Sequence, residues 1–162
     1  FSSQVGAGST FWFTAPLGQQ QNPDAHAQSV HAAADLDPSE ASRTVLYIED
    51  NPSNLRLVSR LLRTRETVRL LTAQTGKLGV QLAEAHQPDL ILLDMHLPDT
   101  DALEILDTLR GDASRPVLIL SADAGAQTVR KAREAGASEF LTKPLDVSSF
   151  YTTLDAYLFG ER

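Results

Sequence analysis

A doubly wound α/β domain is the fold class that this sequence predicts, and three observations lead to it. From Arg43 onward, five short apolar runs alternate with five segments whose apolar residues recur at helical spacing. The runs are almost continuously apolar, as in strands of a parallel sheet that is covered on both faces. Strands and helices that alternate in this way are joined by right-handed crossovers, which build an open sheet with helices on both sides.

The elements can be assigned in chain order. The first helix follows Asn51, which can cap it, and begins with Pro52, whose backbone angle suits a first helical residue. The fourth helix, over residues 125–135, is weakly apolar, and Gly136 is its expected C-terminal stop. The predicted strands cover residues 45–48, 68–71, 90–93, 117–120 and 139–141. The predicted apolar faces of the other helices are Leu55, Val58, Leu61 and Leu62; Leu78, Leu82 and Ala85; Ala102, Ile105, Leu106 and Leu109; and Phe150, Leu154, Tyr157 and Leu158.

The chain changes character upstream of this domain, which we place at residues 43–160. Residues 1–17 contain a β-prone aromatic run, Phe-Trp-Phe, that predicts a short strand. Residues 18–42 are rich in Gln, Ala, Asp, Ser and Pro and bury too little apolar surface to fold, so we expect a flexible linker with at most a short helix at residues 25–34. The sequence begins without Met and without the features of a signal peptide, which predicts a fragment of a longer chain.

Charge and composition argue against several classes of protein. The 162 residues carry a formal net charge of −7, whereas a general nucleic-acid binder is usually basic. The absence of cysteine excludes disulfides, thiol catalysis and cysteine-ligated metals. No apolar run approaches the roughly 18 residues that a membrane-spanning helix needs, so we expect no membrane contact.

Polar and charged residues follow the apolar runs. Glu49 and Asp50 follow the first run, Asp94 the third, Ser121 the fourth, and Lys143 comes shortly after the fifth. The carboxyl ends of parallel strands meet at one edge of a doubly wound sheet, and sites form there. The sequence therefore predicts that three carboxylates, one hydroxyl and one ammonium group converge.

This set of groups favours phosphoryl transfer. Three neighbouring carboxylates repel one another and need a cation or a bound proton. Oxygen ligands with open water positions suit Mg²⁺ better than a closed Ca²⁺ cage. A metal ion there would neutralise an incoming phosphoryl group, while Asp94 acts as nucleophile and Lys143 and Ser121 contact phosphate oxygens. Positioning and charge neutralisation are what phosphoryl transfer mainly requires.

Four segments in order, VLYIEDN, LILLDMHLPDTDALEIL, VLILSA and FLTKP, resemble the receiver domain of two-component response regulators over about residues 43–159. The resemblance implies a flavodoxin-like sheet with strand order 2-1-3-4-5 and a cytoplasmic location. It implies that Asp94 accepts the phosphoryl group. It also implies that Mg²⁺ or Mn²⁺ is bound directly by Asp50, Asp94 and the backbone carbonyl of His96, and through water by Glu49.

The same resemblance implies a conformational switch. Ser121 matches the hydroxyl that turns towards the phosphate, and Phe140 matches the aromatic residue whose ring moves inward when it does. Lys143 matches the lysine of the family that contacts the phosphate, and the Lys143–Pro144 peptide is expected to be cis. Ala102 is a departure, because the family usually has glycine in this loop and helix after Asp94.

The N-terminal segment GAGSTFWFTAPL resembles the closing strands of the ATP-binding domain of sensor histidine kinases. Residues 1–17 would then be a C-terminal remnant of that domain. A receiver downstream of it is the order found in hybrid histidine kinases. Because the rest of an ATP-binding domain is absent from the sequence, we expect no ATP binding by this segment.

The leading hypothesis is a receiver that takes a phosphoryl group from a histidine kinase or a histidine phosphotransfer domain and catalyses at most its own dephosphorylation. A weak homodimer is a further option for its partners, and no nucleic acid is expected. Two alternatives stay open: a pseudo-receiver that acts only as a docking or dimerisation module, and a stand-alone hydrolase on the same fold.

Overall fold

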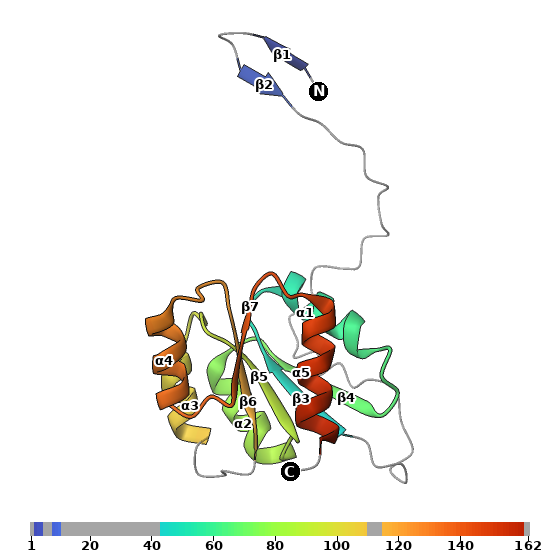
Figure 1. Cartoon of the computed structure of the whole chain (residues 1–162), viewed down its shortest axis with the longest axis vertical. Coiled ribbons are helices and arrows are strands. Elements are labelled where there is room, and N and C mark those ends of the chain that lie inside the picture. The colour runs from blue at the N-terminus through green and yellow to red at the C-terminus, as the bar shows by residue number, and fades with distance from the viewer. Residues whose placement is uncertain (1, 5–7, 11–42, 110–114, 161–162) are drawn as a thin grey trace, which may run out of the picture.

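A computed structural model describes residues 2–4, 8–10, 43–109 and 115–160, and its main body is an open parallel sheet between two layers of helices (Figure 1). Five strands run in the order β4-β3-β5-β6-β7, which is 2-1-3-4-5 when the strands of the sheet are numbered along the chain. All four neighbouring pairs are parallel. The predicted fold class and strand order are confirmed. The strands are β3 (Arg43–Ile48), β4 (Val68–Ala73), β5 (Leu90–Asp94), β6 (Val117–Ser121) and β7 (Glu139–Thr142).

Helices cover both faces of the sheet, and each layer encloses its own apolar core. One core lies among α2, α3, α4 and the sheet, and the other lies among α1, α5 and the sheet. Strand β3 contributes to both, since alternate side chains of a strand point to opposite faces. Its Leu46 and Ile48 enter the first core, whereas Val45 and Tyr47 enter the second. The helices are α1 (Pro52–Leu62), α2 (Gly76–His86), α3 (Ala102–Leu109), α4 (Ala126–Glu134) and α5 (Val147–Phe159).

Helix α2 buries a different face from the one predicted. Leu78 is 41% exposed and Ala85 is exposed, whereas Gly76, Gly79 and Ala83 are buried. The reason is a close approach to the sheet: a Cβ on Gly79 would lie 2.4 Å from the side chain of Ile48. Glycine fits at that distance without a shift of Ile48, so the predicted face was wrong for Leu78 and Ala85, whereas Leu82 is partly buried and packs against the core as predicted.

The ends of the other helices follow the predicted signals. Asn51 caps α1 by accepting a hydrogen bond from the backbone N–H of Ser53, and Pro52 is the first helical residue. Gly136 follows α4 with φ of 108°, a conformation that favours glycine and ends the helix. In α5, Tyr157 is only half-buried, and its hydroxyl donates to the carbonyl of Ser138.

The first residues form a second, smaller sheet. β1 (Ser2–Gln4) pairs antiparallel with β2 (Gly8–Thr10). The strand predicted for the Phe-Trp-Phe run, the linker at residues 18–42 and its short helix lie outside the described residues. Within the described ranges, no helix has the length and apolarity that crossing a bilayer requires.

Candidate functional site

Three carboxylates meet at the carboxyl edge of the sheet. Asp94 is the last residue of β5, and Glu49 and Asp50 directly follow the neighbouring strand β3. One oxygen from each side chain lies within 4.8 Å of the others. Glu49 is 1% exposed and Asp94 is 6% exposed, whereas Asp50 faces solvent. The predicted convergence of the strand ends therefore occurs, and two of its three charges are buried.

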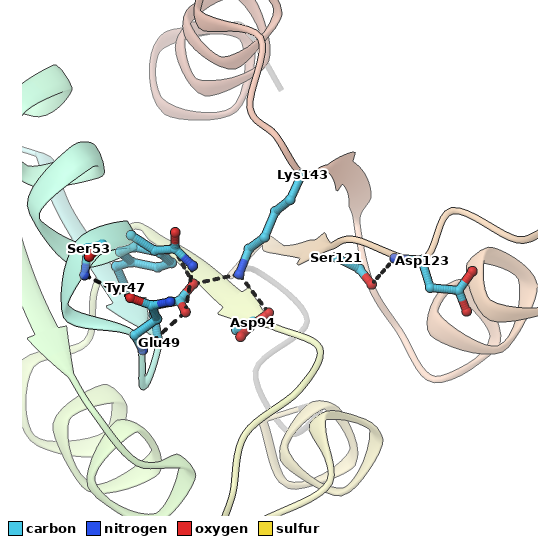
Figure 2. A network of polar contacts seen from close by, with 9 residues as sticks. Tyr47, Glu49, Ser53, Asp94, Ser121, Asp123 and Lys143 are labelled. Carbon is cyan, nitrogen blue, oxygen red and sulfur yellow. Dashed lines mark hydrogen bonds and ion pairs between the residues drawn. The ribbon is translucent and has the colours of Figure 1, made fainter. Parts of the chain in front are cut away.

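Lys143 enters this cluster from the loop after β7, on the far edge of the sheet. Its Nζ donates to Glu49 Oε2 at 2.6 Å and to Asp94 Oδ1 at 2.9 Å, so one ammonium group bridges the two buried carboxylates (Figure 2). The Lys143–Pro144 peptide is cis, the geometry that the resemblance implied. Glu49 and Lys143 thus form an ion pair although they are 94 residues apart in the sequence.

Glu49 is held from four directions. Its Oε2 accepts the Tyr47 hydroxyl at 2.6 Å in addition to Lys143. Its Oε1 accepts the backbone N–H of Asn51 at 3.2 Å and the side-chain amide of Asn54 at 2.9 Å. A carboxylate offers about four lone-pair positions, so each has a donor. The arrangement fixes Glu49 as an ionised, immobile acceptor.

The two buried carboxylates differ in their pKa values. Burial alone disfavours the charged form of Glu49, but hydrogen bonds from Lys143, Tyr47 and Asn54 outweigh burial and hold the pKa of Glu49 below its usual range. For Asp94, burial prevails over the hydrogen bond from Lys143, and the charge of Glu49 adds to it, so the pKa of Asp94 is raised. Burial opposes the charge of Lys143 too, yet the bonds to both carboxylates raise its pKa.

Ser121 lies on the other side of the cluster, at the end of β6. Its side chain is fully buried, and its Oγ accepts the backbone N–H of Asp123 at 3.1 Å (Figure 2). Asp123 itself accepts bonds from the backbone of Gly125 and the hydroxyl of Thr128, which fixes the turn into α4. Phe140, in β7, is half-buried and packs against the core under α2, α3 and α4.

The loop after Asp94 carries the remaining predicted residues. The side chain of His96 is exposed, and its backbone forms an isolated bridge with Asp101. Ala102, where the resemblance led us to expect glycine, begins α3 and is fully buried in the core. A methyl side chain therefore packs well at this position, and the helix starts there without a glycine.

Comparison with known proteins decides the family. Residues 45–155 match the model of the response regulator receiver domain family. The chain belongs to this family. The transcriptional regulatory protein KdpE of Mycobacterium tuberculosis is 37% identical over 112 residues, which cover 69% of this chain and 49% of KdpE. The chain thus spans about half the length of that relative. The polar-differentiation response regulator DivK of Brucella abortus is 32% identical over 122 residues, covering 72% of this chain and 97% of DivK.

Solved structures agree on the fold. The chemotaxis protein CheY4 of Vibrio cholerae superposes with a TM-score of 0.67 at 24% identity, over 73% of this chain and all of CheY4. The receiver domain of the Saccharomyces cerevisiae response regulator Ssk1, solved with the phosphotransfer protein Ypd1, gives 0.67 at 22% identity over 73% of this chain and 90% of that one. The protein is therefore a receiver domain of two-component signalling, with an acidic pocket formed by Glu49, Asp50 and Asp94.

The donor set of the receiver pocket fits a hard divalent cation. Three carboxylates face one ammonium group, which leaves about two negative charges uncompensated among these residues. The ligand atoms offered are all oxygens, and exposed Asp50 leaves room for water, as Mg²⁺ prefers. The residues present therefore match the ion that the family implies.

Two polar partners of the receiver pocket were not predicted from sequence. Tyr47 lies inside an apolar run, and Asn54 lies on the first turn of α1. Residues i and i+2 of a strand share a face of the sheet, so a hydroxyl two positions before Glu49 was a signal that pointed to the pocket. The apolar run by itself predicts only that Tyr47 is part of a buried strand.

Proposed function

We propose that Asp94 is the phosphoacceptor of this receiver domain. The observation that carries the proposal is the bridge of Lys143 to both Asp94 and Glu49 at the carboxyl edge of the sheet. This bridge places a positive charge beside a buried carboxylate at the carboxyl end of β5 (Figure 2). An incoming phosphoryl group would meet a nucleophile and a counter-charge already in position, which is the main need of phosphoryl transfer.

The transfer that we propose makes one bond and breaks one. A carboxylate oxygen of Asp94 attacks the phosphorus of a phosphohistidine, and an O–P bond forms as the N–P bond breaks. The imidazole leaves with the electron pair of the broken bond and takes a proton from solvent. The carboxylate form of Asp94 needs no general base, because it has no proton to lose before it attacks.

Side chains of this chain would bind the metal ion and the phosphoryl oxygens. Asp50, Asp94 and the backbone carbonyl of His96 would hold Mg²⁺ or Mn²⁺ directly, and Glu49 would hold it through water. When bound, the ion supplies positive charge next to the phosphoryl oxygens. Lys143 would pair with one of these oxygens as a point charge.

Ser121 and Phe140 are the proposed readout of phosphorylation. The Ser121 hydroxyl accepts from the backbone N–H of Asp123 at 3.1 Å, so its own O–H stays available to donate to a phosphoryl oxygen when the side chain turns towards it. Space vacated on this side would then admit the half-buried ring of Phe140. Ser121 and Phe140 would then have two arrangements, and the charge of the phosphoryl group would favour one of them, which is what a receiver needs in order to signal.

The partner that we propose is a histidine kinase or a histidine phosphotransfer domain. Ssk1 provides the precedent, since its receiver was crystallised with the phosphotransfer protein Ypd1. Both classes of partner deliver phosphohistidine, the donor that the proposed chemistry requires.

The test is intact-mass spectrometry after incubation with Mg²⁺ and acetyl phosphate, a small phosphoryl donor. We expect the chain to gain one phosphoryl group, and we expect Asp94→Asn to gain none. Exposed Asp107, on α3, provides a matched control, and Asp107→Asn should be phosphorylated like the unchanged protein.

The outcomes separate the proposal from its alternatives. No gain of mass by the unchanged protein, with Mg²⁺ or with Mn²⁺, would favour a pseudo-receiver that only docks or dimerises. Gain by both the unchanged protein and Asp94→Asn would place the phosphoryl group elsewhere. Rapid turnover of unrelated phosphate esters would favour a hydrolase.

We further propose that the receiver belongs to a hybrid histidine kinase. The support is the resemblance of GAGSTFWFTAPL to the closing strands of a kinase ATP-binding domain, together with the antiparallel pairing of β1 and β2 within residues 2–10. The test is the gene sequence upstream of the codon for Phe1. A phosphoacceptor-histidine helix and complete ATP-binding motifs are expected there, and an unrelated coding sequence would contradict the hybrid origin.

A further inference from the structure

Tyr47 brings a hydroxyl group from inside the sheet to the edge of the pocket. The residue is fully buried in the core between α1, α5 and the sheet, among leucine and valine side chains. Its hydroxyl donates to Glu49 Oε2 at 2.6 Å (Figure 2). The ring thus belongs to the apolar core, while the hydroxyl belongs to the charged cluster.

We propose that Tyr47 is a positioning residue that holds Glu49 for metal binding and lets Lys143 leave Glu49 when a phosphoryl group arrives. The inference rests on the proposed function, since it concerns the same metal and phosphoryl site. It assigns a role to a residue that touches neither the metal ion nor the phosphoryl group.

The hydrogen bond from the Tyr47 hydroxyl explains how Tyr47 holds Glu49 for metal binding. Lys143 and the Tyr47 hydroxyl share one atom of Glu49, Oε2, and both bonds are 2.6 Å long. Together with the two donors on Oε1, they fix the carboxylate in one orientation. Outer partners of this kind orient a metal-binding group and set its affinity.

The movement of Lys143 explains the second part. Once Asp94 is phosphorylated, Lys143 must pair with a phosphoryl oxygen, and its hydrogen bond to Glu49 then weakens or breaks. A buried carboxylate that loses its donor is costly. Because the Tyr47 hydroxyl stays on the same oxygen, Glu49 keeps a donor at Oε2 when Lys143 turns away.

Packing alone does not account for the hydroxyl. A phenylalanine would fill the same space between α1 and α5 without a polar atom to bury, and its neighbours in this core are aliphatic or aromatic. Burying a hydroxyl is unfavourable unless it is hydrogen-bonded. Here its acceptor is the carboxylate that also holds Lys143, so the hydroxyl acts on the pocket.

The experiment is a calorimetric titration of Mg²⁺ into the full chain, with three proteins compared. Tyr47→Phe removes only the hydroxyl and keeps the ring. Tyr151→Phe is the matched control, because the hydroxyl of Tyr151 donates to the carbonyl of Leu61, away from the pocket. We expect the Mg²⁺ Kd to rise about tenfold or more in Tyr47→Phe, the usual effect of losing an outer partner of a metal ligand. We expect no change in Tyr151→Phe.

Two further variants make the test specific. In a Glu49→Gln background, Tyr47→Phe should cause no additional loss of Mg²⁺ affinity, because the hydroxyl acts through that carboxylate. Tyr47→Leu lacks the hydroxyl and packs differently, so an equal loss of affinity in both hydroxyl-free variants assigns the effect to the hydroxyl. Tyr47→Leu also serves if Tyr47→Phe fails to fold.

A second readout concerns the rate of phosphorylation by acetyl phosphate. In Tyr47→Phe, the Mg²⁺ concentration that gives half the maximal rate should rise by the same factor as the Kd. An unchanged Kd in Tyr47→Phe, or an equal further loss in the Glu49→Gln background, overturns the inference and leaves the proposed function intact. Absence of Mg²⁺ binding by the unchanged protein overturns the proposed metal site itself.

Discussion

The two sides of the pocket are held in different ways. On the acid side, formed by Glu49, Asp94 and Lys143, every contact is a charge-assisted bond, and Glu49 alone accepts four donors. On the hydroxyl side, formed by Ser121 and Phe140, one backbone N–H reaches Ser121 at 3.1 Å and the phenylalanine ring is only half-buried. Both sides lie at the ends of neighbouring strands of one sheet.

This difference separates the groups that prepare the pocket for phosphoryl transfer from the groups that respond to it. Groups that must be in place before a reaction gain from being fixed, because no reorganisation is then needed in the transition state. Groups that must report on the reaction need two arrangements of similar free energy, and a lightly held hydroxyl meets that need. The predictions below test whether the acid side is as strongly held, and the hydroxyl side as lightly held, as the contacts indicate.

Removing the shared ammonium group should have the largest effect. Lys143→Met leaves Glu49 and Asp94 facing each other without a cation. We therefore expect the free energy of unfolding of the metal-free protein to fall by about 3 kcal/mol, the usual result of breaking a buried ion pair. Phosphorylation by acetyl phosphate should slow by about 100-fold, since a preorganised charge on the phosphoryl oxygens is lost. Urea unfolding and single-turnover kinetics measure the two effects.

A lysine outside the pocket provides the control for that variant. Lys131→Met, on the exposed side of α4, should leave both the unfolding free energy and the phosphorylation rate close to those of the unchanged protein. Equal unfolding free energies and phosphorylation rates in Lys143→Met and Lys131→Met would show that the contacts of Lys143 with the acid side have no particular effect.

Neutralising the two buried carboxylates should change stability in opposite directions. Glu49→Gln removes an acceptor whose ionised form is favoured, so we expect a loss of about 1–3 kcal/mol, the cost of leaving buried donors without a partner. Asp94→Asn removes a charge whose ionised form is disfavoured by burial and by Glu49, so metal-free protein should unfold at a higher temperature. Differential scanning calorimetry in chelator at pH 7 decides, and shifts of the same sign would contradict the pKa assignments.

The effects of Glu49→Gln and Asp94→Asn on stability should change with pH over different pH ranges. The pKa of Glu49 is lowered, so its stabilisation is complete above the usual value of 4.5 and is lost as the pH falls through the lower folded-state value. The pKa of Asp94 is raised, so its penalty is full at neutral pH and fades as the pH falls through the folded-state value towards 3.8.

Thermal midpoints between pH 7 and pH 3.5 measure these two limits. We expect the advantage of Asp94→Asn over the unchanged protein to have disappeared at pH 3.8, while the deficit of Glu49→Gln stays constant down to about pH 4.5. An advantage of Asp94→Asn that grows in acid would mean that the pKa of Asp94 is lowered instead.

The smallest effect on stability should come from the hydroxyl side. Ser121→Ala removes one uncharged hydrogen bond, from the backbone N–H of the exposed residue Asp123, so the free energy of unfolding should change by about 1 kcal/mol or less. Phosphorylation of Asp94 should persist, whereas any phosphorylation-dependent change in the NMR signals of Phe140 should be lost. A destabilisation as large as that of Lys143→Met would mean that both sides are equally well held.

Much of this pocket could be predicted from sequence because strand geometry is regular. Asp94 and Ser121 end apolar runs, and parallel strands bring such ends to one edge. Lys143 could be placed near them by the same argument. The sharing of Lys143 between Glu49 and Asp94 could not, because it depends on side-chain torsions that the pattern of residues does not specify.

The two errors have different physical causes, and the first is contact distance. The buried face of α2 was predicted from leucines, but Gly79 lies against Ile48 of β3 and Gly76 lies against Ile105 of α3, both at distances that leave no room for a larger side chain. Hydrophobic periodicity reports which residues avoid water and does not report how near two backbones approach. Tyr47 was overlooked for the converse reason, since a core residue was judged by its ring and its one polar atom was left out.

The five-stranded sheet keeps two parts of the pocket against opposite layers of helices. Tyr47 ties the acid side to the layer of α1 and α5, whereas Phe140 rests on the layer of α2, α3 and α4. The whole sheet thus lies between the two layers. Protein engineers could therefore retune cation affinity by repacking one layer and retune signalling output by repacking the other, with little interference between the two adjustments.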